Sequence, residues 1–172
     1  MTLQEARVAA PLLITRIFDA PRELVWKAWT DPKYVMQWYG PKGFTSPVCK
    51  IDFRVGGKFL FCMRAPDGKE YWNGGEYFEI VLHEKIVYSM YFADPEGNRV
   101  DPATLGISHK ASDELYDVVG FEDLGNGKTK LTFRGNESME DARNSGQYEG
   151  WMQILEKMAG VLAGLAQARA GH

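Results

Sequence analysis

Few residues of this 172-residue chain stand at spacings that support catalysis or metal binding. The chain has three histidines, His83, His109 and His172, and none has a Ser, Cys or Asp at the spacing of a catalytic triad or a metal site. His109 would serve as a general base only if it lay over a cavity, and a solvated loop histidine is the alternative. We therefore predict no metal, no cofactor and no catalytic residue.

Two carboxylates, Glu76 and Glu79, stand in a segment with the composition of a strand. A carboxylate on a central strand can act as an acid or base if desolvation raises its pKa. Because strand neighbours point in opposite directions, only one of the two can face a core. A salt bridge on the sheet surface is the alternative role. Glu79, Arg54 and Tyr77 are the remaining candidates for an enzyme site.

Asp52 and Arg54 precede Gly56-Gly57, a pair that predicts a two-residue turn between strands at 48–55 and 58–65. If the aromatic residues at 59 and 61 face inward, this pairing places Asp52 and Arg54 on the same face, beside any pocket. In the opposite assignment both charged side chains are solvated. The second strand is apolar on both faces, so periodicity leaves the two assignments open; we expect the solvated position.

Composition and charge argue against several classes of protein. The net charge is −3 and no Lys/Arg run occurs, which argues against nucleic acid as a partner. The first twenty residues lack the pattern of a signal peptide, and no segment is long and apolar enough for a transmembrane helix.

Two cysteines, Cys49 and Cys62, make no disulfide framework, and pairing around the predicted turn places Cys62 opposite Ile51. We expect two structural thiols and a cytoplasmic protein with no membrane partner.

Large aromatic and sulfur-containing side chains are the most prominent feature. Aromatic residues make up 13% of the chain. The abundance of Tyr, Trp and Met favours an irregular cavity wall, since their polar or flexible ends suit such a surface, whereas an ordinary filled core is the alternative. We predict that the ligand-binding residues are Trp38, Phe59, Phe61, Met63, Trp72, Tyr77, Tyr88, Met90, Phe133, Trp151, Leu155 and Met158.

The elements that would position these residues follow from local signals. A first strand is predicted at 12–18. A short helix should follow, with its cap at 19 or 20 and Pro21 as its first helical residue. Asp31-Pro32 predicts the start of a second short helix. Hairpins follow, with strands at 70–82 and 85–92 and another pair at 115–124 and 128–134. The last pair flanks Asn126-Gly127, a strong hairpin signal.

Two further segments complete the prediction. Residues 94–112 exceed the length of a hairpin loop and are either a lid or a surface excursion. Apolar residues from Trp151 to Leu165 recur at helical spacing, and Gly160 and Gly164 would allow this helix to pack closely on a sheet. The sequence thus predicts a single α+β domain over 1–172: a curved antiparallel sheet of six or seven strands, two short helices and one long C-terminal helix. A gap between sheet and helix would be the natural ligand site.

Several ordered motifs resemble the START-like (SRPBCC) superfamily, in the branch named for the activator of heat-shock protein 90 ATPase. The resemblance covers about residues 12–167. The motifs are Asp19 to Trp26, Thr30-Asp31-Pro32, Trp38 to Pro41, Asp52 to Gly57, Gly75 to Ile80 and Glu149-Gly150-Trp151. The resemblance implies the helix-grip fold of START and Bet v-like proteins, with a cavity between the sheet and the C-terminal helix.

Three functions are compatible with this resemblance, because fold alone does not decide among them. The first is binding of an apolar or aromatic small molecule, as a carrier, sequestering protein or sensor. The second is an interaction module that regulates a chaperone ATPase. The third is an enzyme similar to polyketide cyclases and aromatases. The absence of a recognisable catalytic set favours the first.

Overall fold

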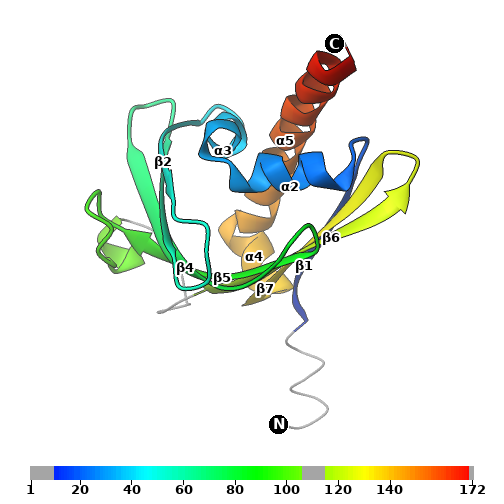
Figure 1. Ribbon diagram of the computed structural model, residues 1–172. Helices are drawn as coiled ribbons and strands as arrows, with labels where there is room; N and C mark the ends of the chain where they lie inside the picture. The colour runs from blue at the N-terminus through cyan, green and yellow to red at the C-terminus, as the bar shows by residue number, and fades with distance from the viewer. Residues whose placement is uncertain (1–9, 106–114, 171–172) are drawn as a thin grey trace, which may run out of the picture.

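The computed structural model describes residues 10–105 and 115–170, and Figure 1 shows their arrangement. Seven strands form one antiparallel sheet in the order β1-β7-β6-β5-β4-β3-β2. The strands are β1 (Pro11–Phe18), β2 (Thr45–Ile51), β3 (Lys58–Arg64), β4 (Glu70–Val81), β5 (Lys85–Ala93), β6 (Leu115–Gly125) and β7 (Lys128–Ser138). The helices are α2 (Arg22–Thr30), α3 (Pro32–Trp38), the 3-10 helix η1 (Pro102–Leu105), α4 (Met139–Ser145) and α5 (Gln147–Ala170). The predicted α+β helix-grip fold is confirmed.

Helix α5 lies in the concavity of the curved sheet, and α2 and α3 close one side of that space (Figure 1). The predicted apolar stripe of α5 is confirmed, since Trp151, Leu155 and Met158 are buried. They pack in one core with Phe133 of β7 and Val25 of α2. Burial of this stripe against the sheet stabilises the packing of α5, because apolar area removed from water contributes about 25 cal/mol per Å².

Local capping explains where the two short helices begin. The Asp31 carboxylate accepts a hydrogen bond from the Lys33 N–H at 3.0 Å and caps α3, whose first residue is Pro32, as predicted. Pro21 is the N-cap of α2 rather than its first helical residue, and no side chain caps that helix. The predicted cap at 19 or 20 is therefore wrong by one position, because the extended φ and ψ of Pro21 keep it outside the helix.

Glycine-containing turn sequences predicted the β6–β7 hairpin correctly and the β2–β3 hairpin incorrectly. Asn126 and Gly127 both have positive φ, 56° and 74°, and join β6 to β7 as expected. The predicted two-residue turn at Gly56-Gly57 is wrong, because β2 ends at Ile51 and six residues connect it to β3. Ile51 pairs with Phe59, and Cys62 pairs with Val48 rather than with Ile51.

The long connection after β5 is described in part. The side chain of Asp94 accepts hydrogen bonds from the backbone N–H groups of Glu96 and Asn98, at 2.9 and 2.8 Å, and organises a tight turn. Ala93 and Arg99 then form an isolated bridge, and η1 follows. Residues 106–114, with His109, lie outside the described residues, as does His172.

Gly160 and Gly164 do not pack against the sheet. A Cβ atom at either position would meet nothing within 4 Å, and both residues are exposed. The predicted close-packed glycine ridge is therefore wrong, because both glycines lie on the face of α5 opposite the buried stripe that contains Met158 and Leu162. Among the helices of the described ranges, none combines the length and apolar character needed to cross a membrane.

Candidate ligand pocket

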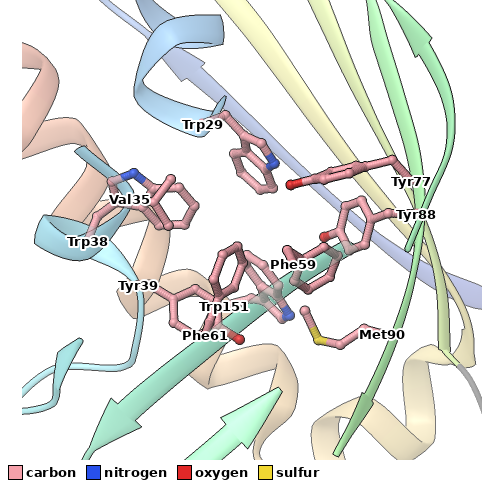
Figure 2. A pocket seen from close by; sticks show the side chains of 10 residues that line it. All are labelled: Trp29, Val35, Trp38, Tyr39, Phe59, Phe61, Tyr77, Tyr88, Met90 and Trp151. Carbon is pink, nitrogen blue, oxygen red and sulfur yellow. The ribbon is translucent and has the colours of Figure 1, made fainter. Parts of the chain in front are cut away.

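The space between the sheet and α5 contains an aromatic pocket, shown in Figure 2. Its walls come from α2, α3 and the residue after α3, from β3, β4 and β5, and from α5. The lining residues are Trp29, Val35, Trp38, Tyr39, Phe59, Phe61, Tyr77, Tyr88, Met90 and Trp151. Eight of these ten residues are aromatic, so the pocket offers ring faces and edges on nearly every side.

The pocket is narrow in this conformation. The cavity has a volume of about 20 Å³, or about 340 Å³ when the crevices between atoms and the open mouth are included. The smaller of these two volumes determines which ligand fits without rearrangement of side chains, and it has room for roughly one water molecule. A larger guest requires the lining side chains to move.

Close backbone packing forms the sheet side of the pocket. Phe59 and Phe61 stack at a centroid distance of 4.7 Å, and Phe59 pairs with Gly75 across β3 and β4. A Cβ atom on Gly75 would overlap the Phe59 ring and the backbone oxygen of Ser89. Glycine at this position therefore lets the Phe59 ring lie flat on the sheet.

Trp151 closes the pocket from the side of α5. Its ring lies 4.2 Å from the Phe133 ring of β7, measured between centroids, and is parallel to the Trp29 ring of α2, at 6.1 Å and 7°. This one side chain therefore joins the long helix, a short helix and the sheet.

Tyrosine hydroxyl groups supply the polar atoms of the pocket. The Tyr39 hydroxyl donates a hydrogen bond to Asn73 Oδ1 at 3.0 Å, between two buried side chains. Burial raises the pKa values of Tyr39, Tyr77 and Tyr88 above their ordinary value. All three phenols are therefore neutral hydrogen-bond donors at physiological pH.

Sequence reasoning missed a buried carboxyl group next to Tyr88. Asp117 of β6 is directly opposite Tyr88 and is 2% exposed. Burial raises the pKa of Asp117 well above its ordinary value, and the charge of Glu137 raises it further, whereas hydrogen bonding with Tyr88 lowers it. Asp117 alternates with the buried Val119 and Phe121, so an inward position could have been suspected from strand periodicity.

Seven of the twelve residues predicted to bind a ligand line this pocket. They are Trp38, Phe59, Phe61, Tyr77, Tyr88, Met90 and Trp151. Sequence reasoning missed Trp29, Val35 and Tyr39. Trp29 and Val35 belong to the short helices α2 and α3. Nothing in the local sequence indicates that these helices contact α5.

The other five predicted residues lie elsewhere. Phe133, Leu155 and Met158 are fully buried in the core between the sheet and α5. Met63 lies further along the Phe59–Phe61 face and is half-buried near Gly40. Trp72 pairs with Cys62 and alternates with Asn73, so it points to the opposite face of the sheet.

The charged candidates lie on the surface. Asp52 and Arg54 form an ion pair with each other at 2.9 Å, with their side chains 54% and 70% exposed, so the solvated position is confirmed. Phe59 and Phe61 face inward even though the charged pair is solvated. Both are possible together because the register pairs Phe59 with Ile51 and Phe61 with Cys49, and not with Arg54 and Asp52. Glu79 pairs with Lys85 at 2.8 Å, which confirms the predicted surface salt bridge.

The cysteines are free and Cys62 is fully buried, whereas Cys49 is half-buried. Burial raises the pKa of Cys49 to about 12 and that of Cys62 to about 11. Both thiols are therefore protonated and weakly reactive at physiological pH. His83 adopts a left-handed backbone conformation, with φ of 62°, in the turn between β4 and β5, and its ring contacts Trp26 edge-on.

Glu137 is expected to make stability depend on pH. Burial raises its pKa from 4.5 to about 7, with a smaller rise from Asp141 and an opposing hydrogen bond from Gln147. A raised carboxyl pKa means that the unfolded chain ionises first, so the wild type loses stability as the pH rises from 4.5 to about 7. Glu137→Gln keeps a hydrogen-bond acceptor for Gln147 and removes this loss. Urea unfolding should therefore show the variant gaining stability over wild type through this window and a constant gap above it.

Glu122→Gln, on the exposed side of β6, is the matched control for loss of one negative charge. The assignment to Glu137 would be wrong if Glu122→Gln gained as much over the same pH range, or if the gap between Glu137→Gln and the wild type did not change with pH.

Comparison with known proteins agrees with this fold. A solved structure from Arthrobacter aurescens is 26% identical, covers 91% of this chain and 87% of its own, and superposes with a TM-score of 0.75. A structure from Chromobacterium violaceum is 25% identical, covers 88% of this chain and 96% of its own, and has a TM-score of 0.70. A structure from Mycobacterium smegmatis is 24% identical, covers 90% of this chain and 91% of its own, and has a TM-score of 0.73. No functionally curated protein matches the chain. The family described as Activator of Hsp90 ATPase homolog 1-like protein matches residues 19–163, and the chain therefore belongs to that family.

Proposed function

We propose that this protein binds a small aromatic molecule in the pocket between its sheet and α5. The observation that carries the proposal is the convergence of eight aromatic rings from six elements and the residue after α3 on one partly open space. Sites for apolar ligands are commonly concave, mostly apolar and provided with a few polar groups that fix orientation. The neutral hydroxyl groups of Tyr77 and Tyr88 are such groups.

The narrowness of the pocket limits the class of ligand. A flat ring slides between stacked side chains with less displacement than a bulky or branched molecule. Met90 is half-buried and unbranched, so it is the lining residue that moves most easily. The proposed ligand is therefore one or two aromatic rings in size, and binding displaces side chains rather than strands.

Filling the pocket tests this proposal. Met90→Trp places an indole ring into the space, and we expect affinity for benzyl alcohol and indole, measured by titration calorimetry, to fall about tenfold or more. Phe78→Trp is the matched control, because Phe78 is exposed on the other face of β4. Wild-type affinity in Met90→Trp, or an equal loss in Phe78→Trp, would contradict the proposed site.

A second candidate function, regulation of a chaperone ATPase, has one observation in its favour. Phe78 and Tyr116 form an exposed ring pair at 5.8 Å on the face of the sheet away from α5. Exposed apolar groups are typical of protein interaction sites, although two rings make a small patch. Measuring the ATPase rate of a purified Hsp90-type chaperone with and without this protein separates this function from ligand binding.

A further inference from the structure

Asp117 interrupts the apolar face that β6 presents to the helices. Val119 and Phe121, the next residues on that face, are 0% and 4% exposed, and Asp117 itself is 2% exposed. A buried carboxyl group without a full set of hydrogen bonds costs stability, so its presence calls for a reason. Among the described residues, Asp117 Oδ1 has no hydrogen-bond partner.

Further acceptor oxygens gather beside Asp117. The Cβ position that Gly135 lacks lies 3.3 Å from Asp117 Oδ1 and 3.3 Å from Glu137 Oε1, so both carboxyl groups overlie the same glycine. Gln147 Nε2 donates a hydrogen bond to Glu137 Oε1 at 2.7 Å, which leaves Gln147 Oε1 buried and without a partner in the described part of the chain. Two acceptor oxygens of the cluster, Asp117 Oδ1 and Gln147 Oε1, therefore lack a hydrogen-bond partner among the described residues.

This acceptor cluster adjoins the aromatic pocket. Asp117 lies opposite Tyr88 and interacts with its hydroxyl group, and Tyr88 lines the pocket. Gln147 stands four residues before Trp151 on α5, so both side chains share one helix face. Trp151 forms the wall of the pocket on that side (Figure 2).

We propose that Asp117, Glu137 and Gln147 form a polar subsite that binds the protonated amino group of an aromatic amine, whose ring occupies the pocket. An ammonium group offers three N–H donors and a positive charge, which match the unpartnered acceptors and the two carboxyl groups. Aromatic walls add favourable cation–π contact. This inference rests on the proposed function and adds the class of ligand.

The subsite makes amine binding depend on pH. The titratable groups that face Asp117 are Tyr88 from β5, Glu137 from β7, Tyr39 beyond α3 and, through Glu137, Asp141 of α4. Burial raises the pKa values of both carboxyl groups, so an ammonium ion displaces protons when it binds. Affinity for an amine should therefore rise as the pH rises through about 7, where Glu137 ionises, while affinity for a neutral ligand of equal size should not.

Benzylamine and benzyl alcohol are the probes, since they share a ring and differ in the polar group. Calorimetry on the wild type should show tighter binding of benzylamine at pH 8, an advantage that shrinks toward pH 5. Asp117→Asn should weaken benzylamine about tenfold or more, the loss typical of a hydrogen bond between charged groups, and leave benzyl alcohol within about twofold. Asp123→Asn, at an exposed position on the same strand, is the matched control and should retain the advantage.

The outcomes separate this inference from the proposed function. If benzyl alcohol binds in the pocket but benzylamine gains nothing in the wild type, the amine subsite is wrong and the pocket proposal stands. If neither probe binds, the proposed function fails. Gln147→Leu gives a second test, because it removes the free acceptor and the donor to Glu137 without a change of charge and should weaken benzylamine selectively. Equal effects on both probes would overturn the assignment.

Discussion

Gly75→Ala is expected to destabilise the protein by about 3 kcal/mol or more, a large effect for the addition of one methyl group. A Cβ atom at this position would overlap the Ser89 backbone oxygen on one side and the Phe59 ring on the other. The oxygen belongs to the adjacent strand β5 and cannot move without disturbing the sheet, while Phe59 is held between Phe61, Tyr77 and Tyr88. Urea unfolding at 25 °C measures the loss.

Gly160→Ala is the matched control, because the same change has the opposite expected sign there. Gly160 lies in α5, is exposed, and would place its Cβ in open space. Alanine stabilises an exposed helix interior by about 0.5–1 kcal/mol relative to glycine. A loss below about 1 kcal/mol for Gly75→Ala would mean that the sheet relaxes at this position and that the aromatic floor is not tightly constrained.

Local signals were sufficient for most elements and failed where a distant strand decided the geometry. Asp31-Pro32 and Asn126-Gly127 predicted their helix start and turn because a carboxylate cap and positive φ act within four residues. Gly56-Gly57 misled because Gly56 N–H bonds to the Tyr77 oxygen at 2.8 Å, and Tyr77 N–H to the Gly57 oxygen at 3.0 Å. The glycines thus pair with β4, and the turn that Gly57 N–H closes on the Arg54 oxygen, at 2.8 Å, lies within the six-residue connection instead of joining β2 directly to β3.

The pocket was predictable in kind but not residue by residue. Phe59, Tyr77 and Tyr88 were identified from aromatic content on strands, whereas Trp72 was misplaced because its face depends on the β3–β4 register. Trp29 was missed because helical spacing shows that it is buried but not what it contacts. Asp117 was missed although strand periodicity places it on the same face as Val119 and Phe121; its position opposite Tyr88 follows only from the assembled sheet.

Trp151→Ala is expected to cost about 3–5 kcal/mol, the range found for removal of a large buried aromatic side chain. Trp151 is 7% exposed and contacts both Phe133 and Trp29, so its loss separates α5 from the sheet and from α2 at the same point. The variant also gains a cavity shaped like the missing indole ring. Trp72→Ala is the control on the opposite face, where the half-buried side chain should contribute less than about 2 kcal/mol.

Added indole distinguishes a ligand-shaped cavity from general loss of packing in these two variants. A ligand that binds only the folded state stabilises it by RT ln(1 + [L]/Kd), so millimolar indole should raise the Tm of Trp151→Ala by several degrees. Trp72→Ala offers no enclosed space and should respond no more than the wild type does. If indole left the Tm of Trp151→Ala unchanged, the walls of the pocket would have collapsed into the vacated volume. The rings around Trp151 would then behave as a deformable core, and binding in this space would require an occupant that the neighbouring side chains cannot replace.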